Sequence, residues 1–241
     1  MQNTQLLTWD SHILGISVAK IICPKLNSKE LYHSLQKLKE KGIQLVYWCI
    51  DSHDSSAQHA ASFCRGFLAD EKITYIQELK KKYVPLSFPY QDVEVYGSTQ
   101  ANSELERIAI EISKSSRFRN DPKLTTEQTH QLYKHWINNA CQKIVANIVL
   151  VIKNNTHHII GMITIDEKQG RADLSLVGVH PAHQGQGIGK RLVCAATDWS
   201  LQHNYEICQV VTQKTNLKAQ KLYESCGFNE EKREYFYHFW L

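Results

Sequence analysis

The sequence predicts an α/β protein with a mixed, twisted sheet flanked by helices. Short β-branched runs alternate with amphipathic helical stretches along most of the 241 residues. Apolar residues make up 42% of the chain and charged residues 22%, a balance typical of a globular protein with room for one large domain or two small ones. A glycine-rich loop after residue 179 also joins an apolar β-run to a helical pattern.

The first 90 residues form an α/β pattern of their own. Asn27 and Glu30 have the spacing of a capping box, and Gly42 is a natural stop for the helix that they begin. The predicted elements are a helix at 27–41, a strand at 43–50, a helix at 55–65 and a strand at 73–80. We interpret residues 1–90 as an N-terminal α/β subdomain.

Residues 91–241 are interpreted as a second domain. Thr125 and Gln128 again have capping-box spacing at the start of a helix. The predicted elements before the glycine loop are a strand at 92–96, helices at 103–115 and 125–140, and strands at 144–152 and 159–166. A polar turn at 154–157 joins the last two strands into an antiparallel hairpin.

The next strand is apolar but contains a glycine. Leu174, Leu176, Val177 and Val179 are strand-forming residues, and the run ends before Pro181. Gly178 interrupts it, which indicates either a β-bulge or a close approach of another segment to the backbone.

The loop after this strand has the composition of an anion site. Gln184, Gly187 and Gly189 have the spacing Gln-x-x-Gly-x-Gly directly before a helical apolar face. Glycines at a helix N-terminus let backbone N–H groups close around an anion, which the helix dipole also favours. Lys190 and Arg191 add positive charge. The spacing matches neither a Rossmann nor a P-loop motif, although a plain tight turn remains an alternative for the loop taken alone.

A second helical pattern, at 215–228, helps to decide between the interpretations of the glycine loop. Ala219, Leu222 and Tyr223 share one helical face, and Gly227 is a natural helix stop. Together with Asn216, the glycine loop and its preceding strand, this pattern resembles the signature of the GCN5-related N-acetyltransferase (GNAT) superfamily. The resemblance covers the C-terminal part of the chain and implies a GNAT fold and an acetyl-CoA-dependent acyltransferase, an N-acetyltransferase.

The resemblance also implies site residues. Tyr223 is at the position of the residue that protonates the departing thiolate, although a packed helix aromatic is the alternative. The strand pairs with the pantetheine arm, and the loop binds the pyrophosphate. The implied cofactor-binding residues are Val177, Gly178, Val179, Gln184, Gly185, Gln186, Gly187, Ile188, Gly189, Lys190 and Asn216.

These roles are chemically consistent. An acceptor amine with a pKa near 8 loses its proton easily, so a dedicated base is optional and a water chain can serve. A thiol has a reference pKa of about 8.5 and a tyrosine about 10, which makes proton donation by Tyr223 mildly uphill but feasible. A backbone N–H near Val179 can stabilise the negative charge that develops on the carbonyl oxygen.

The two parts of the chain share a pattern. When Gly66-Phe67 is overlaid on Gly227-Phe228, the strand, helix and final strand of the first part fall on those of the last quarter. Ser62 then falls on Tyr223, so this half cannot perform the same chemistry. The first part is either a degenerate, GNAT-like half or a coincidence of two generic βαβ patterns.

A narrower resemblance concerns the acceptor. The segments at 9–19 and 116–140 are similar to those of dTDP-fucosamine (dTDP-4-amino-4,6-dideoxy-D-galactose) acetyltransferases. This implies a nucleotide-linked amino sugar of the dTDP-4-amino-4,6-dideoxyhexose type. Arg117 and Arg119 are candidates to pair with the diphosphate, and Trp136 to stack on a ring. A core position for Trp136 and a helix-end position for Arg117 are the structural alternatives.

Composition sets further limits. The net charge of +4 suits an anionic ligand without requiring nucleic acid. The N-terminus lacks the pattern of a secretory signal, and no apolar run reaches the roughly 18 residues of a membrane span. Seven cysteines without a Cys-x-x-Cys pair indicate reduced thiols and a cytoplasmic protein. The histidines lack paired ligands, so no metal is expected.

Two other functions remain open. One is a GNAT enzyme that acetylates a protein or peptide N-terminal amine, which would favour an acidic acceptor groove. The other is a non-catalytic CoA-binding sensor, which would keep the loop and lose the acid, whereas Tyr223 is present. The sequence also leaves a homodimer open.

Overall fold

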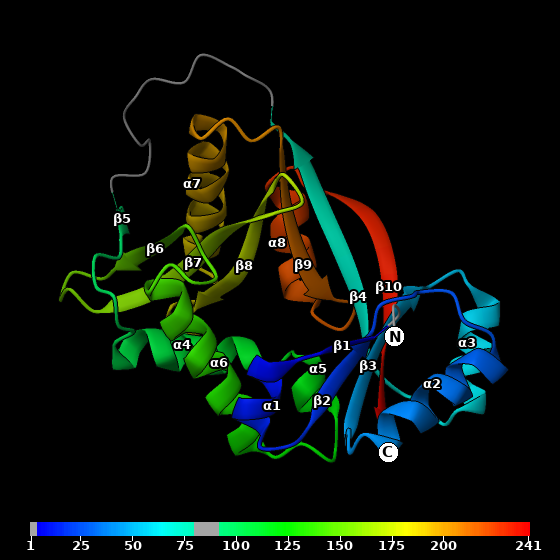
Figure 1. Cartoon of the computed structure of the whole chain (residues 1–241). Coiled ribbons are helices and arrows are strands. Elements are labelled where there is room, and N and C mark those ends of the chain that lie inside the picture. Colours follow the sequence, from blue (N-terminus) through cyan, green and yellow to red (C-terminus); the bar gives the residue numbers. More distant parts are fainter. Residues whose placement is uncertain (1–3, 80–91) are drawn as a thin grey trace.

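The computed structural model describes residues 4–79 and 92–241. These residues form a single ten-stranded mixed sheet with helices on both faces (Figure 1). The α/β class and the mixed sheet predicted from the sequence are therefore confirmed.

The first part of the chain contains four predicted elements and three shorter ones. Asn27 and Glu30 form the expected capping box at the start of α2. The elements are β1 (Thr4–Leu6), α1 (Thr8–Leu14), β2 (Val18–Ile21), α2 (Ser28–Glu40), β3 (Leu45–Asp51), α3 (Ser55–Phe63) and β4 (Phe67–Glu78). The three short elements β1, α1 and β2 were not predicted. The predicted end of the last strand at residue 80, and the division between residues 90 and 91, lie outside the described residues.

The second part of the chain continues the sheet. Its elements up to the glycine loop are β5 (Val93–Val95), α4 (Ser103–Ser113), α5 (Arg117–Asn120), α6 (Thr126–Cys141), β6 (Ile148–Lys153), β7 (Ile159–Lys168) and β8 (Arg171–Val179). A 3₁₀ turn (Pro181–His183), α7 (Ile188–Gln202), β9 (Ile207–Gln213), α8 (Leu217–Ser225) and β10 (Asn229–Trp240) follow.

Two predictions in this part need correction. The strand expected from residue 144 begins only at Ile148, because Lys143 has a φ of 59° and the chain turns there after α6. The short helix α5 was not predicted, since its four residues are too few for a periodic pattern. The capping box of Thr125 and Gln128 is confirmed.

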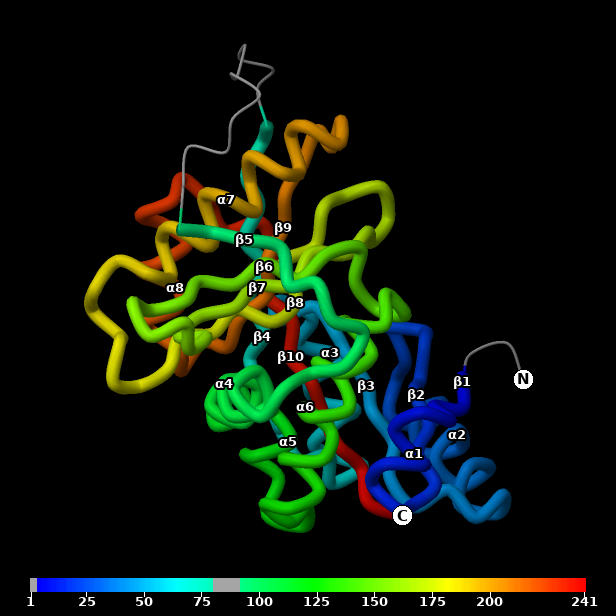
Figure 2. Tube along the Cα trace, turned by 90° about the vertical axis from the view of Figure 1, so that its left-hand side faces the viewer, coloured from blue at the N-terminus to red at the C-terminus, as the bar shows by residue number. Residues whose placement is uncertain are grey.

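The order of strands interleaves the two parts of the chain. It is β1-β2-β3-β10-β4-β9-β8-β7-β6-β5, so the last strand lies between two strands of the first part. Strand β10 is antiparallel to both β3 and β4 along most of its length. In Figure 2 the red trace of β10 runs through the middle of the molecule.

The same sequence of elements occurs twice. The series β2, α2, β3, α3 and β4 of the first part matches the series β8, α7, β9, α8 and β10 in order and type. Each series exchanges its final strand, since β10 pairs with β3 and β4 pairs with β9. The overlay of Gly66-Phe67 on Gly227-Phe228 thus corresponds to two series with the same order of elements in one sheet, and the origin of the first series as a GNAT-like half stays a prediction.

Helices cover the sheet in two layers. One face carries α2 and α3 over the first half and α7 and α8 over the second, and each pair has its own apolar core. The opposite face carries α1, α4, α5 and α6 over one continuous core that includes residues of both halves. In Figure 1 this second helical layer lies along the lower edge.

Two searches of the described residues are negative. Over 4–79 and 92–241, no helix has both the length and the apolar character needed to cross a bilayer. In the same residues, no group of three or more histidine, cysteine or acidic side chains is arranged to hold a metal ion.

Candidate active site

A gap opens between the adjacent parallel strands β8 and β9. They pair with each other only where Ala172–Leu174 faces Cys208–Val210. Beyond these residues β8 stays paired with β7 and β9 with β4, but not with each other. Strand β8 continues to Val179 and β9 to Gln213 on opposite sides of the gap. Carboxyl ends of parallel strands are a common place for ligands in α/β proteins.

The β-bulge of β8 lies at the start of the gap, between Leu174 and Val177. The register shifts where β8 has one extra residue opposite β7, and the Leu176 N–H donates to the Thr164 hydroxyl at 2.9 Å. A bulge at 177–179, one of the two predictions for this glycine, is therefore wrong. The other is confirmed: a Cβ on Gly178 would lie 2.6 Å from Ile108 and 2.8 Å from Ile112, so the glycine lets α4 pack closely.

The glycine loop is exposed and its helix begins without a side-chain cap. Gly185 and Gly187 have φ values of 79° and 76°, which favour glycine. Gly187 is the N-cap of α7, and no side chain accepts a hydrogen bond from the first-turn N–H groups. These groups, at the positive end of a helix dipole, are therefore available to an anion.

Other residues of the motif hold the loop in place. The Gln184 amide donates to the Val179 carbonyl at 3.2 Å, which ties the loop to the end of β8. The Arg191 guanidinium donates to the Gln186 carbonyl at 3.3 Å. Lys190 is exposed beside them. Arg191 thus supports the loop, and Lys190 leaves a positive charge free at its edge.

The corresponding helix of the first half has no such opening. The Asn27 side chain accepts a hydrogen bond from the Glu30 N–H at 3.0 Å, and the Glu30 carboxylate accepts one from the Asn27 N–H at 2.9 Å. The buried Trp48 indole donates to the Cys23 carbonyl at 2.8 Å, beyond the end of β2. In the first half, side chains of the protein thus bind the backbone groups at the start of α2 and after β2, whereas the corresponding N–H groups at the start of α7 have no side-chain partner.

Helix α8 meets the loop at a third glycine. A Cβ on Gly189 would lie 3.1 Å from Leu222 and 3.8 Å from Val179, so α7, α8 and the end of β8 converge there. Asn216 is the N-cap of α8, and its side chain accepts the Ala219 N–H at 3.2 Å. Its structural role is therefore clear, and its predicted contact with the cofactor stays a prediction.

Tyr223 lies on the buried side of α8. Its side chain is 4% exposed, and its ring centroid is 6.2 Å from those of Tyr75 and Phe228. Burial raises the pKa of Tyr223 above its ordinary value, and the nearby Cys226 thiol adds to the increase. A tyrosine in this environment stays protonated, which is the form that a proton donor needs.

Arg117 joins the two segments that resemble the amino-sugar enzymes. Its guanidinium carbon lies 4.0 Å from the ring centroid of Phe118 and 4.3 Å from that of Phe236. It also lies close to the carboxylate of Asp10, whose pKa is raised by burial and lowered in part by Arg117. The segments around Asp10 and Arg117 thus meet on the face of β3 and β10 that α1, α4, α5 and α6 cover.

The two other acceptor candidates have different surroundings. Arg119 is exposed and donates a hydrogen bond to the Thr126 hydroxyl at the start of α6. Trp136 is half-buried, its ring is 5.6 Å from that of Tyr133, and it packs against the core below α6. The arrangement of Trp136 agrees with the structural alternative, and the structure does not gather the three candidates into one cluster.

Asp70 was missed by the sequence analysis. It lies on β4, close to Arg117 and to the Gln213 side chain. Burial raises the pKa of Asp70 to about 6, although Arg117 and the Gln213 side chain act in the opposite direction. No local motif marks this residue, because only the pairing of β4 with β9 brings it to the gap.

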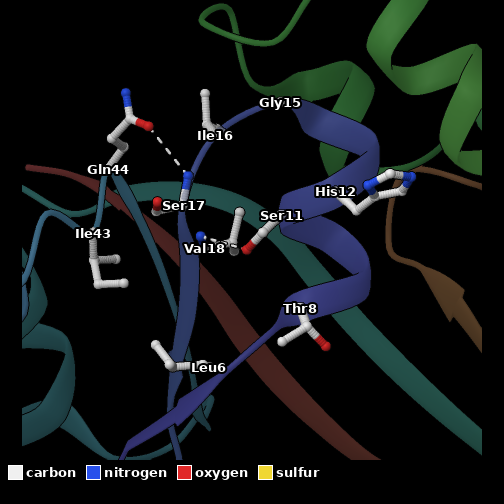
Figure 3. A pocket seen from close by; sticks show the side chains of 10 residues that line it. All are labelled: Leu6, Thr8, Ser11, His12, Gly15, Ile16, Ser17, Val18, Ile43 and Gln44. Atoms are coloured by element: carbon white, nitrogen blue, oxygen red, sulfur yellow. Dashed lines mark hydrogen bonds between the residues drawn. The ribbon is translucent and has the colours of Figure 1, made fainter.

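A separate depression lies at the edge of the sheet. It has a volume of about 470 Å³ and is lined by β1, α1, β2 and the residues before β3 (Figure 3). The Ser11 hydroxyl accepts the Val18 N–H at 2.9 Å, and the Gln44 side chain accepts the Ser17 N–H at 3.1 Å. These bonds fasten α1 and the β3 turn to β2, so the polar groups there have structural partners.

Known proteins share this architecture. Residues 110–228 match the Acetyltransferase (GNAT) family. The spore coat polysaccharide biosynthesis protein SpsD of Bacillus subtilis is 22% identical over 246 residues, which cover 96% of this chain and 81% of SpsD.

Two solved structures are similar over most of the chain. A GCN5-related N-acetyltransferase from Sphaerobacter thermophilus superposes with a TM-score of 0.62 and 15% identity, covering 98% of this chain and 76% of the other. A tandem GNAT protein from the clavulanic acid biosynthesis pathway has a TM-score of 0.59 and 12% identity, covering 92% and 75%. The matched sequence family, the paired halves and the gap between β8 and β9 lead to one conclusion: the chain is a member of the GNAT superfamily of acetyltransferases.

Proposed function

We propose that the protein transfers an acetyl group from acetyl-CoA to the amino group of a nucleotide-linked amino sugar of the dTDP-4-amino-4,6-dideoxyhexose type. Both substrates bind together and the transfer is direct. The observation that carries the proposal is the open β8–β9 gap beside a glycine loop whose helix has no side-chain cap. A thioester arm fits along the unpaired edge of β8, and a pyrophosphate fits the loop.

In this proposal each segment has one task. Residues 184–190 bind the pyrophosphate through backbone N–H groups and the charge of Lys190. The side of Val177, Gly178 and Val179 that faces β9 without pairing to it binds the pantetheine arm, and an N–H near Val179 stabilises the charge that develops on the carbonyl oxygen. Asn216 contacts the cofactor near the thiol.

Proton transfer completes the reaction. The neutral amine forms a C–N bond to the acetyl carbon, and its nitrogen then loses one proton to water. The C–S bond breaks, and Tyr223 donates its proton to the departing thiolate. The raised pKa of Tyr223 keeps its proton available at neutral pH. Solvent returns the proton to Tyr223 after the products leave.

Two observations support a sugar acceptor. SpsD carries a name from spore coat polysaccharide biosynthesis, and the similarity to it extends over both halves of the chain. Arg117 and Asp10, which lie in the segments that resemble the amino-sugar enzymes, are neighbours in space. The net charge of +4 also suits two anionic substrates.

The test is an acetyl-CoA consumption assay that measures released thiol. The acceptor panel contains dTDP-4-amino-4,6-dideoxyhexoses, the corresponding free amino sugars and peptides with a free N-terminal amine. We expect turnover with the nucleotide-linked sugars above that with the free sugars. Turnover with peptides only would replace this proposal with a protein or peptide acetyltransferase, and acetyl-CoA binding without any turnover would indicate a sensor.

A further inference from the structure

Asp70 lies beside the open part of the gap. Lys72 on β4 pairs with Gln213 on β9, and Asp70 is two positions further along β4 toward the same end of the sheet. Gln213 is beyond the last β9 residue that pairs with β8. The Asp70 carboxylate interacts with the Gln213 side chain, so Asp70 lies beside the strand that borders the gap.

The two faces of the sheet supply different groups to this gap. Tyr223 belongs to the core under α7 and α8. Asp70 is on the opposite side of the sheet, close to Arg117 of α5, which packs on Phe236. A thioester held in the gap would thus have its proton donor on one face and a carboxylate on the other.

Polar groups near Asp70 are left without partners. Tyr47 is 1% exposed, its hydroxyl lies near Asp10 and Arg117, and it makes no hydrogen bond of good geometry to any residue in 4–79 or 92–241. The buried Nε of Arg117 is also without such a bond in that part of the chain. Buried polar groups in this state are expected to meet a ligand or water.

We propose that Asp70 is the catalytic base, and that it takes the proton of the acceptor's ammonium group on the α5 side of the gap. The inference rests on the proposed acetyl transfer but not on the identity of the sugar. One N–H bond of the ammonium breaks and an O–H bond forms on Asp70. The free electron pair then attacks the thioester carbon, and the nitrogen loses its second proton to water as the amide forms. The C–S bond breaks, and Tyr223 protonates the thiolate. Asp70 returns its proton to solvent when the product leaves.

The charged and titratable groups around Asp70 allow this role. Burial raises the pKa of Asp70 to about 6, and the nearby Glu71 acts in the same direction. Arg117 on α5, Lys72 on β4 and the Gln213 side chain oppose the increase. Tyr133 on α6 also interacts with Asp70. A carboxyl with a pKa near 6 is largely ionised at pH 7 and is a better base than an ordinary aspartate.

The experiment compares Asp70→Asn with Glu71→Gln. Both remove one negative charge from adjacent residues of β4, but Glu71 forms an ion pair with Lys214 at 2.6 Å. We expect Asp70→Asn to lower kcat at pH 7 by about 10²-fold, with unchanged acetyl-CoA binding, and Glu71→Gln to stay near wild type. Equal kcat values for Asp70→Asn and wild type would overturn the proposal.

A pH profile separates a base from a merely structural residue. The wild-type kcat should fall as pH drops through about 6, where Asp70 becomes protonated. In Asp70→Asn this acid limb should disappear, and kcat should rise toward pH 8 and above as the free amine forms by itself. Asp70→Glu should recover part of the activity. A wild-type kcat without a break near pH 6 would contradict the proposal even if Asp70→Asn failed to fold.

The acceptor and the base are tested separately. If the wild-type protein acetylates a peptide or another amine instead of a nucleotide sugar, the same variants are assayed with that amine. Loss of activity in Asp70→Asn would then support the base while the sugar proposal fails. Turnover of the nucleotide sugar that is insensitive to Asp70→Asn would give the reverse result.

Discussion

The guanidinium of Arg117 lies 4.7 Å from the ring centroid of Tyr47. Arg117 belongs to α5 in the second part of the chain, and Tyr47 belongs to β3 in the first part. The contact therefore places residues from both halves around the same site. A domain made from residues 91–241 alone would lack Asp10, Tyr47 and Asp70 on the side of the sheet where we propose that the acceptor binds.

Arg117 should contribute to stability as well as to the site. We expect Arg117→Met to lower the free energy of unfolding by about 1–3 kcal/mol, since it removes cation–π contacts and leaves two partly buried carboxylates without their cation. Arg119→Met is the control, because Arg119 is exposed and should change stability by less than about 0.5 kcal/mol. Urea unfolding measures both, and equal effects would contradict the assignment.

Tyr223→Phe should separate chemistry from binding. The ring stays packed among Tyr75 and Phe228, so the fold is retained while the proton is lost. We expect kcat to fall by about 10²-fold and acetyl-CoA affinity to stay nearly constant. Steady-state kinetics and calorimetric titration give the two quantities. An unchanged kcat would remove Tyr223 from the role of the acid.

The glycine loop can be tested with a matched pair of variants. Gly187 and Gly170 both have a φ of 76°, so a glutamate at either position has the same backbone strain of about 1 kcal/mol. Only Gly187 is at the N-terminus of α7. We expect Gly187→Glu to abolish acetyl-CoA binding through bulk and negative charge, and Gly170→Glu to retain it. Calorimetric titration decides, and retained affinity in Gly187→Glu would refute the loop assignment.

Stability should fall in acid because of a buried histidine. His238 is fully buried, its Nδ1 lies 2.6 Å from Asp121 Oδ2, and burial lowers its pKa although Asp121 acts in the opposite direction. The unfolded chain therefore binds a proton at a higher pH than the folded one. Stability should decrease below about pH 6.5, by up to about 1.4 kcal/mol per pH unit.

Asp121 adds a second step at lower pH. Its burial would raise its pKa, but hydrogen bonds from His238, Lys123 and Trp240 lower it below the ordinary value. The contribution of Asp121 to the free energy of unfolding is present above about pH 4 and is lost as pH falls through its lower pKa in the folded protein.

The histidine is tested by denaturant unfolding between pH 7 and pH 5. The free energy of unfolding should depend less on pH in His238→Gln than in the control His53→Gln, since His53 is exposed. Equal slopes would contradict this account.

The interleaved sheet predicts cooperative unfolding. Strand β10 pairs with β3 and β4, so neither half can lose its structure without breaking the pairing of the other. We therefore expect one calorimetric transition whose van't Hoff and calorimetric enthalpies agree. Two separate transitions would show that the halves are independent.

Much of the fold follows from local sequence. The capping box at Asn27 and that at Thr125 each place a helix start to the residue, because the bonds involve neighbours in the chain. The Gln-x-x-Gly-x-Gly loop also determines its own geometry through positive φ values and the uncapped start of α7. These features, with the residues around Tyr223, were enough to indicate the GNAT superfamily and its cofactor.

The position of the bulge in β8 and the presence of the short helix α5 could not be predicted from the local sequence pattern. Gly178 is compatible with either a bulge or close packing, and the choice depends on Ile108 and Ile112 of α4. Helix α5 has only four residues, so its position is set by packing against β4 and α6 rather than by periodicity.

By itself, the sequence determined most of the longer elements, the glycine loop at the start of α7 and the repeated order of strand, helix and final strand. The tertiary structure alone decided that β10 enters between β3 and β4 and that Asp70 reaches Arg117 and Gln213. The reason is the range of the interactions. Caps and turns depend on residues that are neighbours in the chain, whereas strand exchange and the charges around the acceptor side depend on pairings between distant segments that no local spacing encodes.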